Sequence, residues 1–331
     1  MKAIVRTAYG SPDVLQLQEV EKPVPKDGEV LVRVHAASVN ALDWHYMRGK
    51  PFLARTGGNG LRKPTDPRLG VDLAGRVEAV GSNVTQFQVG DEVFGRVGKG
   101  LGAFAEFVCA REDAVALKPA ALTFEAAAAV PVAALIALQG LRDKGQIQPG
   151  QQVLIQGASG GVGTFAVQIA KAFGAEVTAV CSTRNVDMAR SIGADHVIDY
   201  TQADFTKNEQ QYDLILAVNG YHPILAYRRA LRPAGIYVMV GASNAHLMQA
   251  LLQAMLLGPV MSRTGSKKMV LLMVKNLPQA DLALIKELLE AGKVVPVIDR
   301  CYPLHETAEA VRYVEEGHAH GKVVIAVEHH G

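Results

Sequence analysis

The sequence lacks an apolar run long enough to cross a membrane. Its longest apolar stretch, residues 247–261, is interrupted by Gln249 and Gln253 and broken at Gly258-Pro259, whereas a span needs about 20 apolar residues. The opening MKAIVRTAYG contains no apolar segment of signal-peptide length and no Arg- and Ser-rich transit character. These absences predict a protein with neither a membrane span nor a leader.

Neither sign of charge dominates, because 34 basic residues face 32 acidic ones for a formal charge of +2. No basic block stands out, so the overall balance gives no reason to expect nucleic acid or an anionic membrane as partner. Cysteine is scarce: Cys109, Cys181 and Cys301 are far apart and odd in number. This argues against a disulfide framework and predicts a cytoplasmic location.

The chain is long and ordinarily globular, with 331 residues, 49% of them apolar and 20% charged. Since single cores stop growing at about 250–300 residues, two domains are expected. Residues 1–115 contain short runs rich in Val, Ala and Phe, separated by glycine-containing turns, which predicts a β-rich domain. Residues 49–69 read as one long loop that contains Arg55, Arg62, Lys63 and Arg68 and a Gly-Gly-Asn-Gly sequence, and long loops are usually functional or mobile.

The residue pattern of the sequence changes near residue 122. An Ala-rich helical segment, residues 123–141, contains Pro131 as an expected break. Apolar strands then alternate with helices, which predicts a doubly wound parallel sheet covered on both faces. The expected strands are residues 152–156, 176–180, 196–198, 214–218 and 236–240, with residues 269–274 as a possible sixth. Residues 302–327 return to helix plus strand and are expected to rejoin the first domain.

One motif carries chemistry. Residues 152–163 read QVLIQGASGGVG, a buried strand that enters a glycine-rich turn and opens a helix. This fits a dinucleotide-binding fingerprint: Gly160 lets the backbone approach a diphosphate, and Gly163 lets the helix pack closely on the strand. The alternative is a glycine-rich turn without a ligand. The predicted contacts are Ala158, Ser159, Gly160, Gly161, Val162 and Gly163.

The residues at the end of the second strand indicate whether the cofactor is NAD or NADP. An NAD site has an acidic residue there for the ribose 2′-hydroxyl, but no Asp or Glu lies between Val177 and Val186. Ser182, Thr183 and Arg184 lie there instead and are suited to a 2′-phosphate. NADP(H) is therefore expected; the alternative is that Arg184 is an ordinary solvated arginine.

At this point the chain resembles the medium-chain dehydrogenase/reductase superfamily, within it the zinc-independent quinone oxidoreductase branch. The resemblance covers nearly the whole sequence. It rests, in order, on SVNALDW (38–44), LGVDLAG (69–75), VGDEV (89–93), GGVG (160–163), SIGAD (191–195) and GKVV (321–324). It implies a GroES-like catalytic domain, residues 1–122 and 277–331, and a Rossmann NADP(H)-binding domain, residues 123–276.

The resemblance also implies further site residues. It adds these cofactor contacts: Tyr200, Val218, Asn219, Gly241, Ala242 and Lys322. A lysine after a turn glycine is, on its own, more typical of plain surface. Where zinc-dependent relatives keep metal ligands, this chain has Asn40, Val71-Asp72 and a residue near Val132, so no catalytic metal is expected.

The candidate catalytic residues cluster at one place in the sequence: Asn40, Trp44, His45 and Tyr46. By resemblance Asn40 faces the nicotinamide and orients the substrate or the cofactor amide. His45 is a candidate proton donor, and Trp44 a candidate wall of an aromatic pocket. For each, the alternative is a structural role, and Asp43 is expected to cap or tie a turn.

The implied activity is NADPH-dependent reduction of quinones or α,β-unsaturated carbonyls, with a small hydrophobic electrophile as substrate. One alternative is a metal-independent NADP alcohol or aldehyde reductase. Another is a non-enzymatic NADPH-binding protein, crystallin-like or RNA-binding. A homodimer is expected through residues 269–274, and the methionine-containing stretch 245–261 is expected to be core or dimer packing, or else a wall of the substrate pocket.

Overall fold

The computed structural model describes residues 1–56, 60–98, 100–273 and 278–329. The chain divides into two compact units. Unit 1 is Met1–Ala133, Leu277–Glu290 and Pro296–Gly331; unit 2 is Ala134–Asn276 and Ala291–Val295. Residues 123–133 thus differ from the sequence-based division, because α2 (Phe124–Ala128) packs on the strands of unit 1. Ala291–Val295 join unit 2, where Gln168 bonds both the N–H and the oxygen of Val295.

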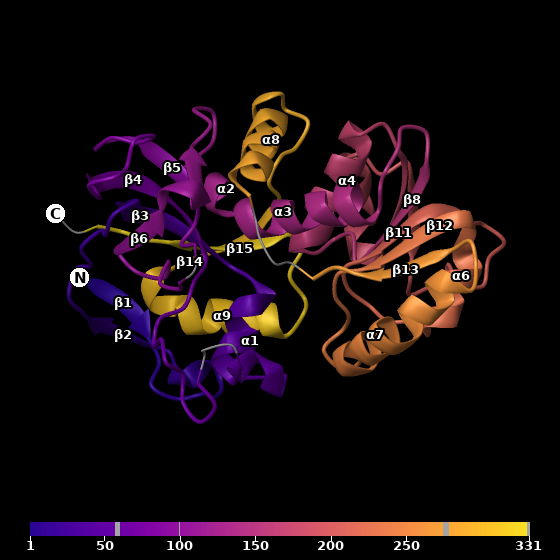
Figure 1. Cartoon of the computed structure of the whole chain (residues 1–331), viewed down its shortest axis with the longest axis horizontal. Helices are drawn as coiled ribbons and strands as arrows, with labels where there is room; N and C mark the ends of the chain where they lie inside the picture. The colour runs from indigo at the N-terminus through magenta and orange to yellow at the C-terminus, as the bar shows by residue number, and fades with distance from the viewer. Residues whose placement is uncertain (57–59, 99, 274–277, 330–331) are drawn as a thin grey trace. The chain divides into compact units, whose positions relative to one another are not determined.

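Unit 1 is built on a seven-stranded sheet, mostly antiparallel, as expected of a β-rich domain. Its long central strand β3 pairs with three neighbouring strands (Figure 1). The strand order is β14 (Ile298–Pro303), β15 (Lys322–Ala326), β3 (Glu29–Val39), β4 (Asp72–Val80), β5 (Glu92–Arg96) and β7 (Val115–Leu117), with β6 (Phe107–Arg111) also paired to β3. β1 (Lys2–Val5) and β2 (Gln16–Glu19) form a separate hairpin.

The C-terminal segment completes this sheet, because β15 pairs antiparallel with β3 and parallel with β14. The C-terminal segment therefore belongs to the same compact unit as the N-terminal one. Besides α2, the helices α1 (Ala41–Arg48), α8 (Gln279–Glu290) and α9 (Thr307–Glu315) accompany the sheet. The long loop contains a short 3-10 turn, Phe52–Arg55, and residues 57–59 of it lie outside the described residues.

Unit 2 is a six-stranded, all-parallel sheet in the order β10-β9-β8-β11-β12-β13. This is the doubly wound order with its switch point between β8 and β11. Figure 1 shows α4 on one side of the sheet and α6 and α7 on the other. The strands are β8 (Gln152–Gln156), β9 (Glu176–Cys181), β10 (His196–Asp199), β11 (Tyr212–Ala217), β12 (Leu231–Met239) and β13 (Lys268–Leu271). The helices are α3 (Pro131–Gln139, beginning in unit 1), α4 (Gly161–Ala172), α5 (Val186–Ser191), α6 (Ile224–Ala230) and α7 (Leu247–Arg263).

The expected alternation of strands and helices in this half is confirmed, and so is the break at Pro131, which begins α3 after α2 has ended. β8 has its expected bounds, and the ends of the other strands shift by up to five residues, most at β12, which starts at Leu231 rather than residue 236. β13 ends at Leu271, and residue 274 of the expected strand lies outside the described residues. Across the described part of the chain, no helix combines the length and apolarity that crossing a membrane requires.

Candidate functional site

The glycine-rich turn lies between β8 and α4, as predicted. Gly157 adopts φ +80°, a backbone conformation that favours glycine. A Cβ on Gly163 would lie 2.1 Å from the Gly157 carbonyl oxygen, so this glycine sets how closely α4 approaches the turn. A Cβ on Gly160 would meet only that same oxygen, at 3.7 Å, so the surface above Gly160 is open. The first N–H groups of α4 have no acceptor within the helix, and the turn therefore fits a dinucleotide diphosphate.

An acid of β10 lies beside the end of β9, and reading along the sequence missed it. β10 runs parallel to β9 and aligns Asp199 with Cys181. Thr183 donates its hydroxyl hydrogen to Asp199 Oδ2 at 2.5 Å, and this bond helps hold the pKa of Asp199 below its ordinary value. Arg184 is exposed, and none of the described side chains pairs with it. The hydroxyl of Thr183 is thus engaged, while the guanidinium of Arg184 remains available to an anion.

The other predicted cofactor contacts follow the carboxyl ends of neighbouring strands. The N–H groups of Val218 and Asn219 donate to the Gln156 oxygen, which joins the loop after β11 to the end of β8. Asn219 also lies over Gly157, where an added Cβ would be 2.8 Å from its backbone nitrogen. The structure therefore brings Asn219 beside the glycine turn at the switch point. Gly241 and Ala242 follow β12, and Tyr200 is 63% exposed just after β10.

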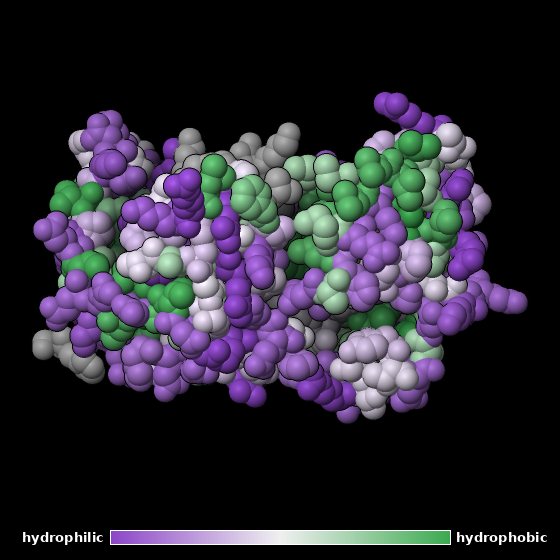
Figure 2. Space-filling model, turned by 90° about the horizontal axis from the view of Figure 1, so that it is seen from below, coloured by the Kyte–Doolittle hydropathy of each residue, from purple (hydrophilic) through white to green (hydrophobic). Residues whose placement is uncertain are grey.

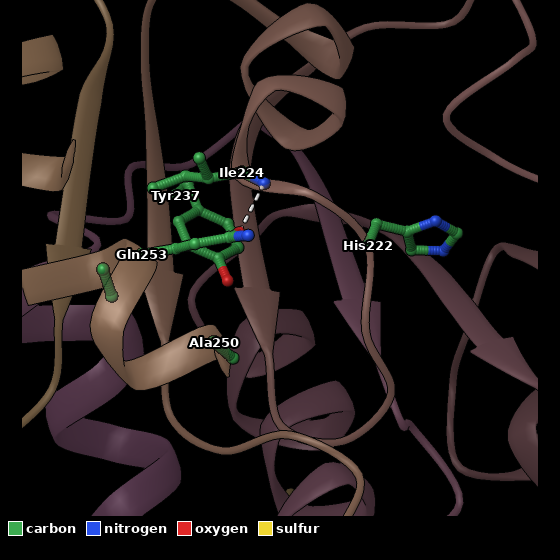
Figure 3. Close-up of a pocket in the computed structure, with 6 residues that line it drawn as sticks. His222, Ile224, Tyr237, Ala250 and Gln253 are labelled. Atoms are coloured by element: carbon green, nitrogen blue, oxygen red, sulfur yellow. Dashed lines mark hydrogen bonds between the residues drawn. The ribbon is translucent and has the colours of Figure 1, made fainter. Parts of the chain in front are cut away.

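A small pocket in unit 2 was not predicted (Figure 3). Gln253 of α7 lies in it, with its Oε1 accepting from the Ile224 N–H at 3.1 Å and its Nε2 donating to the Tyr221 hydroxyl at 3.0 Å. The lining residues are His222, Ile224, Tyr237, Ala250, Gln253 and Ala254. Because its glutamine is already bonded on both sides, the pocket reads as part of the packing between α7 and the sheet.

A buried polar cluster in unit 1 surrounds Asn40, at the end of β3. Lys322 Nζ donates to Asn40 Oδ1 at 2.6 Å and to the Val39 oxygen at 3.2 Å. Asn40 Nδ2 donates to Asp72 Oδ2 at 2.9 Å, and that oxygen lies 3.8 Å from Lys322 Nζ. The Asn40 amide is therefore fixed in orientation. Lys322 is only 3% exposed, so the expectation of a plain surface lysine is wrong: the strand, not the preceding turn, sets its environment.

Further donors complete the cluster. Asp72 also accepts from the Ser38 hydroxyl at 2.9 Å and from the Val132 N–H at 3.1 Å. Asp43 accepts from the Asn40 N–H at 2.7 Å and from the Gly70 N–H at 3.2 Å. This is the capping and turn-tying role expected of Asp43. Burial raises the pKa of Asp43 to about 7. It also raises the pKa of Asp72 and lowers that of Lys322, and their mutual attraction opposes both shifts.

Helix α1 holds the remaining catalytic candidates. Trp44 is 9% exposed and belongs to the hydrophobic core of unit 1, which leaves little of its ring to line a pocket. His45 Nδ1 lies 2.7 Å from the Lys50 carbonyl oxygen, so the nitrogen must donate and Nε2 is left as an acceptor in the neutral ring. Burial lowers the pKa of His45, which further disfavours it as a proton donor. Tyr46 is half-buried against the same core.

The donor set around Asn40 does not fit a zinc ion. Zinc sites use thiolates, imidazoles and carboxylates. Here an amide and an ammonium group occupy the place, and Asp72 is already held by three hydrogen-bond donors. Val71 and Val132 are buried and apolar. Among the described residues no group of three His, Cys, Asp or Glu side chains is arranged to hold a metal.

The raised pKa of Asp43 yields a prediction about stability. Since about 7 lies above the ordinary 3.8, the folded protein binds this proton more tightly than the unfolded chain does. The stabilisation is complete below about pH 4 and is lost as the pH rises through about 7. Because the asparagine amide resembles the protonated acid and does not titrate, the unfolding free energy of the wild type minus that of Asp43→Asn, measured with urea, should therefore fall as the pH rises from about 4 to about 7.

The control for this measurement is Asp187→Asn, which changes an exposed acid of α5. Its difference from the wild type should stay constant over the same range. A constant difference for Asp43→Asn as well would show that the buried carboxyl does not take up a proton in this range.

Comparison with known proteins places both units in described families. Residues 26–120 match the alcohol dehydrogenase GroES-like domain, and residues 192–325 match the family described as zinc-binding dehydrogenase. The structure of the quinone oxidoreductase from Coxiella burnetii superposes with a TM-score of 0.86 at 30% identity, covering 99% of each chain.

Two curated relatives extend this comparison. The chloroplastic quinone-oxidoreductase homolog of Spinacia oleracea is 32% identical over 98% of both chains. The chloroplastic NADPH-dependent alkenal/one oxidoreductase of Arabidopsis thaliana is 32% identical over 98% of this chain and 79% of its own. With the glycine turn, the doubly wound sheet and the GroES-like unit in place, the chain belongs to the quinone oxidoreductase-like branch of the medium-chain dehydrogenase/reductase superfamily, a branch of nicotinamide-dependent oxidoreductases.

Proposed function

We propose that the protein is an NADPH-dependent, zinc-free reductase of quinones or α,β-unsaturated carbonyls. The observation that carries this proposal is the Asn40 amide, bonded to Lys322 and Asp72 at a position where zinc-dependent relatives keep a ligand. Without a metal Lewis acid, a simple aldehyde is a poor hydride acceptor. Quinones and enones delocalise the charge they gain as a quinol or enolate anion, so hydrogen-bond donors suffice to stabilise it.

The preference for NADPH rests on Arg184. Its guanidinium is exposed and unpaired among the described side chains, and it lies next to the end of β9. The relative from Arabidopsis thaliana, named as NADPH-dependent, supports the same choice. The carboxylate of Asp199 opposes it, because Asp199 reaches the same strand end through Thr183. We assign the larger effect to Arg184, since the Asp199 oxygens already accept from Thr183, Thr201 and Gln202.

The bound nicotinamide supplies the hydride, and the residues of the protein hold the cofactor and orient the substrate. The N–H groups at the start of α4 bind the diphosphate, and Arg184 binds the 2′-phosphate. Asn40, fixed by Lys322 and Asp72, orients the carbonyl of the substrate or the amide of the cofactor. Solvent supplies the proton to the resulting anion, because His45 in its neutral form offers a lone pair at Nε2 rather than a hydrogen.

Assembly and location are part of the same proposal. β13 is the edge strand of the parallel sheet, so a homodimer through this edge stays our prediction, and a monomeric mass in solution would contradict it. A cytoplasmic location also stays a prediction, since both curated relatives are named as chloroplastic. The substrate is taken to be a small hydrophobic electrophile.

The test of the activity follows NADPH oxidation at its absorbance band, with an ortho-quinone and a short alkenal offered in parallel. Turnover with NADPH that persists in the presence of a chelator is expected. Product analysis must give a quinol or a saturated carbonyl; an alcohol would instead indicate an aldehyde reductase. Tight NADPH binding with neither acceptor reduced would favour a non-enzymatic NADPH-binding protein.

Arg184→Ala should raise the KM for NADPH by about tenfold or more and leave that for NADH unchanged, because a charge-assisted hydrogen bond contributes about 1.5–3 kcal/mol. Arg190→Ala, an exposed arginine on the neighbouring helix α5, is the matched control. If the wild type turns over faster with NADH and Arg184→Ala changes nothing, Asp199 sets the preference instead.

The two glycines of the turn should separate binding from folding. Gly160→Ala keeps φ −82° and meets no close atom, so the protein should stay stable while cofactor affinity falls, as the methyl group occupies the diphosphate approach. Gly163→Ala should lower both, since its methyl group collides with the Gly157 oxygen and such overpacking costs about 1–3 kcal/mol. Thermal unfolding and fluorescence titration with NADPH measure the two effects. Full affinity in Gly160→Ala would place the diphosphate elsewhere.

A further inference from the structure

A histidine lies in the loop that joins β12 to α7. His246 immediately precedes α7, and its side chain is exposed and makes no capping hydrogen bond to the helix. Its ring is stacked on that of Tyr221, with the ring centroids 4.7 Å apart and the planes 2° from parallel. Its Nδ1 lies 3.0 Å from the Ser243 hydroxyl oxygen. Two contacts thus fix the imidazole, although the helix does not need its side chain.

The ring of Tyr221, on which His246 is stacked, is itself held in place. Its hydroxyl oxygen accepts from Gln253 Nε2 at 3.0 Å, and Gln253 Oε1 accepts from the Ile224 N–H at 3.1 Å, the bond drawn in Figure 3. Because a backbone N–H only donates, the Ile224 bond fixes which end of the amide faces Tyr221. His246 is therefore supported by a second layer of fixed side chains, which a group that meets a ligand requires.

The position of the imidazole hydrogen follows from the neighbour of Nδ1. A hydroxyl group has a hydrogen to donate, and among the described residues Nδ1 of His246 is the acceptor placed to receive that of Ser243. The neutral ring then carries its own hydrogen on Nε2. His45 is the opposite case, because its Nδ1 faces a carbonyl oxygen, which only accepts. His246 therefore offers a donor at Nε2, where His45 offers a lone pair.

The surroundings of His246 leave this hydrogen free for a ligand. No Asp or Glu occurs from Leu214 to Ala280, and in the part of the chain that the structure describes Nε2 bonds to no other group. The next exposed side chains along α7 are largely apolar, with Met248 and Leu252 48% and 51% exposed. Figure 2 views the side on which α7 lies in Figure 1, and hydrophobic side chains gather there over unit 2. The core packing expected for residues 245–261 thus applies to one face of the helix only.

The loops after β11 and β12 lie where the proposed function requires the nicotinamide. In a doubly wound sheet the dinucleotide crosses the switch point, with one half over each set of strands. Arg184, the candidate for the 2′-phosphate of the adenosine half, follows β9, which leaves the ends of β11 and β12 to the nicotinamide half. The Ser243 N–H donates to the Gly220 oxygen at 3.2 Å and so joins the two loops beside Asn219. A hydride acceptor that contacts the nicotinamide therefore comes within reach of His246.

We propose that His246 is a catalytic residue, which donates a hydrogen bond from Nε2 to the carbonyl oxygen of the substrate. This inference rests on the proposed function. When a hydride from the cofactor forms the new C–H bond at the β-carbon of an enone, the electron pair of the C=C bond moves toward the carbonyl group and its oxygen becomes negative. The Nε2–H stabilises this charge, as oxyanion donors do. His246 keeps its proton, and solvent supplies the proton that completes the product.

The test compares NADPH-dependent reduction of a short alkenal by the wild type, His246→Leu and His246→Gln. Loss of one oxyanion donor costs about 100- to 1,000-fold in kcat, so His246→Leu should lower kcat by about a hundredfold and leave the KM for NADPH unchanged. His246→Gln places an amide N–H near the position of Nε2 and should stay within about tenfold of the wild type. With an ortho-quinone the loss in His246→Leu should be smaller, because a quinone accepts electrons more readily and depends less on a donor.

The matched control is His196→Leu, which changes an exposed histidine of the same unit. His196 is the first residue of β10 and so lies at the opposite edge of the parallel sheet from His246. This variant should reduce the alkenal like the wild type, and thermal unfolding should show every variant folded.

Three results would overturn this inference alone: wild-type alkenal turnover in His246→Leu, an equal loss in His196→Leu, or a raised KM for NADPH with unchanged kcat in His246→Leu. A wild type that binds NADPH and reduces neither acceptor overturns the proposed function, and this inference with it.

Discussion

A buried lysine ties together the distant segments of unit 1. Lys322, near the C-terminus, donates to Asn40 at the end of β3, and through Asn40 it meets Asp72 at the start of β4. Asp72 in turn accepts from the N–H of Val132, at the start of α3. Four parts of the chain thus converge on one charge. Burying an ammonium group is strongly unfavourable unless its hydrogens are satisfied and an anion lies near, so the folded domain requires all of these partners in place.

The same constraint shapes the chemistry available to the protein. A cluster that holds one ammonium, two carboxyl groups and an amide already balances its charge once Asp43 carries a proton, as its raised pKa favours near neutrality. A divalent cation added there would meet the lysine at close range. The cluster instead fixes the Asn40 side chain at both ends, which is what a group that orients a ligand requires. Removing one partner of such a buried pair costs about 3–5 kcal/mol, so stability and positioning depend on the same few atoms.

Much of unit 2 is predictable from the sequence because its signals are local. The strand β8, the glycine turn and α4 follow one another along the chain, and Gly160 and Gly163 both face the Gly157 oxygen of the same turn. The sequence did not reveal contacts between segments that are far apart along the chain. Asp199 reaches the end of β9 only because β10 pairs with that strand, and reading for an acid within β9 alone misses it. Lys322 likewise resembles a surface lysine until β15 is seen to pair with β3.

The helix α7 shows that the net charge of the whole chain does not describe the charge of one surface. A formal charge of +2 argues against an anionic partner only if the charges mix evenly. Charges farther apart than about 8–10 Å are largely screened from each other at physiological ionic strength. Only acids within that distance in space offset the bases Arg228, Arg263, Lys267 and Lys268, and the segment that carries them has none of its own. The signal was present in the sequence as the acid-free segment from Leu214 to Ala280. It becomes a property of one surface only when the fold places its bases beside the exposed apolar side chains of α7.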